Sequence, residues 1–218
     1  MGKLNFKREL ARKFVHLLSV LILLIYFLAS DFFNTKIALM ILVLILMVFL
    51  ELEYFRIEVG NKIPILGGIW KYVRRDKEKD KIGGDIFFIV GSILVLAVFD
   101  IRIAMAAMLM TTFGDMAAAL IGKRFGKHWL GFLEDRAWEG ILAEFFVDVC
   151  IGILIFFWQF WYDFSILYNW QLWVVIGVMS LTATIVETLI YKMDDNLIIP
   201  VFSGFNGQMA LLLLSYLY

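Results

Sequence analysis

Cysteine is nearly absent from this sequence, and its absence removes several kinds of chemistry. Cys150 is the single cysteine among 218 residues and lies in an apolar run. The chain therefore has no disulfide framework and no cysteine-based zinc site, and thiol redox chemistry is not expected. A linker rich in Ser, Pro or Gly is also lacking, as is any low-complexity tract. These absences predict a single domain over residues 1–218.

Net charge is absent as well, because 20 Lys and Arg balance 20 Asp and Glu, but apolar residues are abundant. They make up 62% of the chain, against roughly 45 to 50% in soluble domains. A helix that crosses a bilayer needs about 20 mostly apolar residues. The sequence thus predicts an all-α, polytopic transmembrane helical bundle in a lipid bilayer. About seven spans are expected, at 14–30, 36–52, 84–99, 103–121, 140–161, 171–190 and 197–218.

Three of these segments differ from an uninterrupted apolar span of typical length. The third is short, and the last contains Pro200, Gly204, Asn206 and Gly207, so re-entrant or broken helices are the alternative at both places. The first follows a basic stretch, as in a signal peptide, but no small-x-small cleavage site comes after it. We expect a retained signal anchor there.

Positive charge is confined to one side of the predicted bundle. Only Lys36 and Arg102 fall on the opposite side. The positive-inside rule then places the N-terminus in the cytoplasm. We expect a protein of the cell membrane, or of the endoplasmic reticulum in a eukaryote, with its active site facing the cytoplasm and no nucleic-acid partner. The other 18 Lys and Arg lie in the N-terminal stretch and in the connections 53–83, 122–139 and 191–196.

Acidic side chains occur within or at the ends of the spans, where each costs about 2.5 to 3.5 kcal/mol on insertion scales. Asp115 lies about 9 Å inside the cytoplasmic end of its span at 1.5 Å per residue. A shallow layer of carboxylate and amide oxygens suits Mg²⁺, which prefers carboxylates together with substrate phosphates. The alternative is that these groups join helices by pairing with Lys, Arg or hydroxyl partners. The layer comprises Asp115, Glu144, Asp148, Glu187, Asp194, Asp195 and Asn196.

A basic turn bounded by glycines follows Asp115. Gly122 allows close backbone approach, and the cations beside it are donors for phosphate: Lys123, Arg124 and Lys127. The spacing is not that of a Walker A loop. The alternative is a helix C-terminus with ordinary positive-inside charges.

His16, one turn from Arg12, is a candidate proton acceptor or phosphate ligand. Packing at a helix interface is the alternative for this residue.

Together these residues resemble the family of membrane lipid kinases that contains dolichol kinase, phytol kinase and CTP-dependent diacylglycerol kinase. The matching motifs cover almost the whole chain. Where the family usually has a Lys-Lys-Ser/Thr-like stretch before Glu-Gly, this chain has Asp135-Arg136-Ala137-Trp138, which leaves Arg136 as the only cation there. The motifs are Glu9-x-x-Arg12-Lys13-x-x-His16, Gly114-Asp115 through Gly122-Lys123-Arg124-Phe125-Gly126-Lys127, Glu139-Gly140, Glu187, and Asp195-Asn196-Leu197 with Pro200.

The resemblance implies transfer of a γ-phosphoryl group from CTP to the hydroxyl of a membrane isoprenoid alcohol of the dolichol, polyprenol, geranylgeraniol or phytol type. It implies Mg²⁺ held by Asp115 and Asp195 with Glu139 or Glu187, and a proton accepted by a carboxylate or by His16. It assigns the nucleotide to Gly122, Lys123, Arg124, Lys127, Asn196, Arg136, Arg12 and Lys13.

Three other functions remain as alternatives. A CTP-dependent diacylglycerol kinase would differ only in its acceptor. A CDP-lipid synthase would transfer CMP instead of phosphate, but its Pro-Gly-His-Gly-Gly signature is not in this sequence. A transporter or scaffold would predict internal repeats and charge pairs at mid-membrane, and neither is clear here.

Overall fold

The computed structural model describes residues 18–59, 82–131, 136–157, 169–190 and 193–216. Within these residues the regular structure is helical, apart from one isolated bridge between Trp129 and Ala137. The prediction of an all-α fold is confirmed. The chain forms two compact units, Met1–Ile93 and Leu94–Tyr218. The single-domain organisation stays a prediction.

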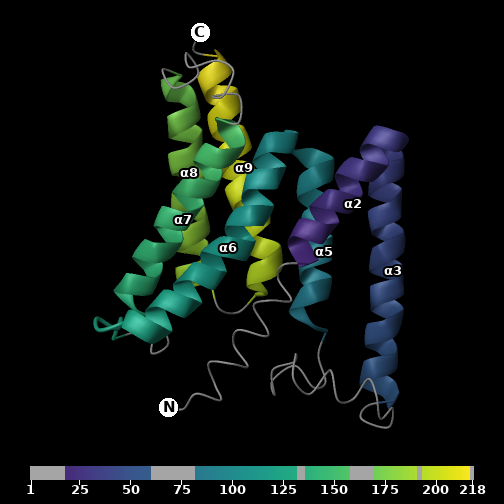
Figure 1. The fold of residues 1–218 in the computed structure, drawn as a ribbon, viewed down its shortest axis with the longest axis horizontal. Coiled ribbons are helices and arrows are strands. Elements are labelled where there is room, and N and C mark those ends of the chain that lie inside the picture. The colour runs from purple at the N-terminus through teal and green to yellow at the C-terminus, as the bar shows by residue number, and fades with distance from the viewer. Residues whose placement is uncertain (1–17, 60–81, 132–135, 158–168, 191–192, 217–218) are drawn as a thin grey trace. The chain divides into compact units, whose positions relative to one another are not determined.

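Seven helices in the described residues follow the predicted segments in order (Figure 1). Four of them, α3, α6, α8 and α9, are long and apolar enough to cross a membrane, so the chain is a membrane protein. The number of spans and the side of the N-terminus stay predictions. The helices are α2 Leu18–Phe32, α3 Thr35–Val59, α5 Gly84–Val98, α6 Ile101–Phe125, α7 Trp138–Phe156, α8 Trp170–Leu189 and α9 Asp195–Tyr216.

The first unit contains α2 and α3, which pack against each other. α3 extends beyond the predicted span, and a buried ion pair lies near its end. Arg56 Nη2 donates to Glu53 Oε1 over 2.8 Å, and the backbone N–H of Gly83 donates to the same oxygen over 2.7 Å. This carboxylate therefore joins the end of α3 to the residue just before α5.

The second unit is built around a close antiparallel contact between α6 and α7. A Cβ atom at Gly140 would lie 2.7 Å from the carbonyl oxygen of Ala118 and 3.1 Å from Gly122 Cα. Two turns along α6, Gly114 lies directly against the carboxyl group of Asp148. Small residues let backbones approach closely in membrane helices, where interhelical packing replaces the hydrophobic effect. We call this contact the glycine seam.

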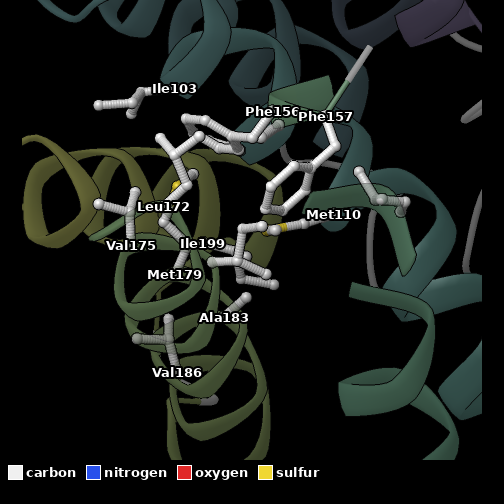
Figure 2. Close-up of a cluster of buried hydrophobic side chains, with 14 of the residues drawn as sticks. Ile103, Met110, Phe156, Phe157, Leu172, Val175, Met179, Ala183, Val186 and Ile199 are labelled. Atoms are coloured by element: carbon white, nitrogen blue, oxygen red, sulfur yellow. The ribbon is translucent and has the colours of Figure 1, made fainter. Parts of the chain in front are cut away.

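Apolar side chains of α6, α7, α8 and α9 form the core of the second unit (Figure 2). Met110 of α6, Met179 of α8 and Ile199 of α9 are each exposed by no more than 1%. On α7, Gly152 leaves room for Ile176 of α8, since a Cβ at 152 would lie 2.6 Å from Ile176 Cγ2. The core thus holds the four helices in register.

The last helix, α9, is continuous through Pro200, so the alternative of a broken last span is wrong. Proline has no N–H to donate to the carbonyl of Asn196, four residues earlier. α9 is held by packing on α6 and α8 instead, and by a hydrogen bond of 3.1 Å from Asn206 Nδ2 to Thr182 Oγ1. The third predicted span is short in the structure as well, since α5 has 15 residues.

The glycine seam is testable with two matched substitutions. Gly140→Ala should reduce the free energy of unfolding by about 1 to 3 kcal/mol, because the new methyl group overlaps the backbone of α6. The loss should appear as a lower unfolding midpoint in detergent. Gly177→Ala on α8 is the control, because a Cβ there meets no atom within 4 Å. It should leave the midpoint unchanged or raise it. Equal effects of the two substitutions would contradict a close seam.

Candidate functional site

The connection between α6 and α7 sets the position of Arg136. Gly126 ends α6, and a Cβ there would lie 2.7 Å from Ala137 Cβ, so only glycine fits this approach. Trp129 and Ala137 form an antiparallel bridge, and the Leu130 N–H donates to the carbonyl of Arg136 over 3.0 Å. These contacts hold the backbone of Arg136 in place just before α7.

Arg136 forms an ion pair with Glu187 near the end of α8, 51 residues further along the chain. Its Nη1 donates to Glu187 Oε1 over 2.5 Å, and its Nη2 donates to the Glu187 carbonyl over 3.1 Å. The Glu187 side chain is 1% exposed and that of Arg136 is 30% exposed. Burial by itself lowers the pKa of Arg136, but attraction to Glu187 outweighs it and the pKa is raised. The guanidinium therefore stays charged.

Two further carboxyl groups lie within electrostatic reach of Arg136, namely Asp115 on α6 and Glu144 on α7. Glu144 and Asp148, one turn apart on α7, both interact electrostatically with Glu187. Three helices thus bring their acidic side chains to one basic group. We call Arg136, Asp115, Glu144 and Glu187 the arginine cluster.

The start of α9 holds the next predicted site residues, Asp195 and Asn196. Asp194 Oδ1 accepts hydrogen bonds from the backbone N–H of Asn196 over 3.1 Å and from its Nδ2 over 3.0 Å. Asp195 Oδ1 accepts from the same N–H over 3.0 Å. Asp194 therefore orients the Asn196 amide. The sequence placed Asp194 in the predicted layer of oxygen groups, and an Asp just before a helix is also a capping signal.

The basic turn lies at the end of α6 and follows Asp115 by 8 to 12 residues. Lys123 and Arg124 are in the last turn of the helix and Lys127 follows it, and all three side chains are exposed. Arg124 lies over the ring of Phe125, 5.3 Å from its centroid. Gly122, predicted to approach a phosphate, is buried in the glycine seam.

The remaining predicted residues divide into one that the structure describes and three that it does not. Glu139, in the first turn of α7, has an oxygen 2.8 Å from His128 Nδ1 and accepts from the His128 N–H over 3.2 Å. Its partner is therefore on the connection and not in the arginine cluster. His16, Arg12 and Lys13 lie outside the described residues.

The donor set for a metal ion is limited. Among the described residues, no three His, Cys, Asp or Glu side chains come together in an arrangement that could hold a metal ion. Mg²⁺ is commonly bound by one or two carboxylates together with substrate phosphates. Asp115 and Asp195 lie on α6 and α9, which pack together, and two carboxylates are as many as such shared coordination needs. A site made from protein ligands alone does not fit these residues.

The fold and the site together define the class of this protein. It is a helical membrane protein in which acidic groups of three helices surround one arginine. The chain is similar to three named kinases. It is 26% identical over 132 residues to a probable chloroplastic phytol kinase of Triticum aestivum, covering 58% of this chain and 44% of that protein. It is 29% identical over 141 residues to CTP-dependent diacylglycerol kinase 1 of Schizosaccharomyces pombe, covering 60% and 61%.

The third relative is phytol kinase 1 of Arabidopsis thaliana, 27% identical over 136 residues, covering 58% of this chain and 43% of that protein. The chain therefore spans about half the length of the curated relatives it matches. No protein-family model and no solved structure matches it. The predicted resemblance to this group of lipid kinases is confirmed.

The ion pair of Arg136 and Glu187 can be tested by its effect on stability. Arg136→Met should lower the free energy of unfolding by about 2 kcal/mol, because it leaves a buried carboxylate without its charged donor. Arg102→Met is the control, because its pair with Asp100 spans 3.4 Å between exposed side chains. It should cost less than about 1 kcal/mol. Equal losses in a denaturant titration would contradict a stabilising pair at Arg136.

Proposed function

We propose that this chain is a lipid kinase that transfers the γ-phosphoryl group of CTP to the hydroxyl of a membrane isoprenoid alcohol at the cytoplasmic interface. The observation that carries the proposal is that Asp115 of the arginine cluster lies on α6, the helix that ends in the exposed basic turn. The printed names of the relatives, phytol kinase and CTP-dependent diacylglycerol kinase, support it.

Phosphoryl transfer suits this arrangement because it depends on positioning and charge neutralisation more than on covalent chemistry by the protein. A bond forms between the alcohol oxygen and the γ-phosphorus, while the bond from that phosphorus to the β–γ bridging oxygen breaks and CDP leaves. The alcohol proton passes to a carboxylate, with Asp115 or Glu187 as the candidates. His16 is a further candidate acceptor.

The cations have the complementary role. Lys123, Arg124 and Lys127 are exposed at the end of α6 and would neutralise the nucleotide phosphates. Asn196, oriented by Asp194, would donate from its amide nitrogen to a phosphate or bind the metal through its amide oxygen. Asp115 and Asp195 would hold Mg²⁺, which would supply positive charge to neutralise the nucleotide phosphates.

Arg136 has a different role from the one that the resemblance implied. Because it already pairs with Glu187, we assign it to positioning that carboxylate instead of binding the nucleotide directly. Glu139, paired with His128, would reach a metal only after leaving that partner.

A second acceptor is favoured by the relative of Schizosaccharomyces pombe, whose name specifies diacylglycerol. The two acceptors share a hydroxyl borne on a lipid chain and differ in the groups beside it. Incubation of the purified protein with γ-labelled CTP, Mg²⁺ and a panel of phytol, geranylgeraniol, dolichol and diacylglycerol separates them by which lipid takes up the label. Release of labelled pyrophosphate without labelled lipid would indicate a CDP-lipid synthase and overturn the proposal.

Replacing the central carboxylate tests the site itself. Asp115→Asn should reduce kcat for lipid phosphorylation by about a hundredfold or more, because it removes the charge that holds metal and phosphate in place. The protein should still purify as a folded species in detergent. The matched control is Asp31→Asn, an exposed carboxylate on α2, which should leave kcat unchanged. Wild-type turnover by Asp115→Asn would remove this residue from the active site.

The basic turn is tested through nucleotide affinity. Lys123→Ala should raise KM for CTP by about tenfold, the loss expected when one charge-assisted hydrogen bond to a phosphate is removed. Its KM for the lipid should change little. Lys36→Ala, an exposed lysine in the first turn of α3, is the control and should leave both constants unchanged. An unchanged KM for CTP in Lys123→Ala would exclude contact with the nucleotide.

A further inference from the structure

Asp148 is a buried carboxyl group for which the arginine cluster provides no hydrogen bond. The residue is 0% exposed, and neither of its carboxyl oxygens has a hydrogen-bond partner among the described residues. Burying a polar group without a partner costs a few kcal/mol, and most buried polar groups in native proteins are paired. Asp148 is thus a position where a partner from outside the chain is favourable.

The surroundings of Asp148 place it beside the proposed site of phosphoryl transfer. Its carboxyl group packs against Gly114, where any Cβ would overlap Oδ1. Gly114 directly precedes Asp115, and consecutive Cα atoms are about 3.8 Å apart. A group that hydrogen-bonds to Asp148 next to this glycine therefore lies at the level of Asp115.

A second unpaired group lies at the same level on α8. Gly152 meets Ile176, whereas Glu144 meets Glu187, so α7 and α8 run antiparallel. Asp148 is one turn before Gly152 on α7, and Ser180 is one turn after Ile176 on α8. Because the two helices are antiparallel, Asp148 and Ser180 lie at the same level, and Ser180 is on the face of α8 that packs against α7. Ser180 is 0% exposed, and its Oγ has no hydrogen-bond partner among the described residues.

We propose that Asp148, with Ser180, binds the hydroxyl of the lipid alcohol and distinguishes it from lipids that have no hydroxyl at that position. This inference rests on the proposed function for the identity of the lipid. The hydroxyl hydrogen-bonds to the carboxyl group of Asp148 and presents its oxygen toward the phosphates held at Asp115. The lipid chain stays among the apolar side chains of the bundle.

A hydroxyl fits this position better than the other polar ligands of the reaction. A metal ion needs several oxygen ligands, and the described residues gather no such set. The nucleotide is highly charged, and its cationic partners lie at the exposed end of α6, whereas Asp148 is 0% exposed. A hydroxyl needs only one or two partners and arrives on an apolar chain.

Asp148 would be a specificity-determining residue, and the experiment uses binding without nucleotide so that catalysis is not required. The full-length protein in lipid nanodiscs is given radiolabelled phytol, which is then displaced by unlabelled phytol or by phytyl methyl ether, which has no hydroxyl to donate. The wild type should prefer phytol by about tenfold, a ratio that corresponds to about 1.4 kcal/mol. Asp148→Leu should bind both ligands with equal affinity.

Two variants complete the test. Asp31→Leu, at an exposed carboxylate of α2, should keep the wild-type preference. If Asp148→Leu does not fold, Ser180→Ala replaces it and should reduce the preference by about threefold or more. An unchanged preference in whichever of these two variants is measured overturns the inference, as does a wild type that binds the two ligands equally.

The outcome is separable from that of the kinase assay. A protein that prefers phytol through Asp148 but does not label any lipid from CTP retains this hydroxyl site and loses the proposed function. A protein that labels a lipid but shows no dependence of binding on Asp148 retains the proposed function and loses this inference.

Discussion

The close approach of α6 and α7 along the glycine seam is the constraint on which the rest of the second unit depends. Carboxyl groups in a membrane protein are costly unless they face the protein interior and find partners. The seam turns the acidic face of α7 inward, since Gly140, Glu144, Asp148 and Gly152 repeat every four residues on one side of the helix. Without glycine at 114, no space for Asp148 would remain beside α6.

The arginine cluster follows from the same geometry. A tight connection ends α6 at Gly126 and returns the chain so that Arg136 meets Glu187 of α8. The charge of Arg136 then compensates acidic groups of three helices. This compensation matters because a buried charge without a partner is strongly destabilising. Arg136 hydrogen-bonds to Glu187, whereas neither carboxyl oxygen of Asp148 has a hydrogen-bond partner among the described residues. The unpaired carboxyl group is therefore the candidate ligand site.

Much of the candidate site was predictable because lipid makes polar residues conspicuous. Asp115, Glu144, Asp148 and Glu187 stand out in apolar segments, and their joint inward orientation is the least costly arrangement. The partner of Arg136 was not predictable, because the pairing joins positions 51 residues apart through a contact of α7 with α8. The structure also gives Glu139 and Gly122 neighbours that the sequence did not predict. A local pattern does not reveal that His128 lies beside Glu139 or that Gly140 lies beside Gly122.

By itself the sequence determined the helical class, the approximate bounds of the helices and which side chains lipid would force inward, because each follows from local hydrophobicity and from the cost of burying charge. Tertiary structure decided the pairings. It selected Glu187 for Arg136, set Gly114 against Asp148 and kept α9 continuous through Pro200. The reason is physical: helix formation depends on neighbours along the chain, whereas the partner of a buried polar group depends on how helices far apart in sequence pack together.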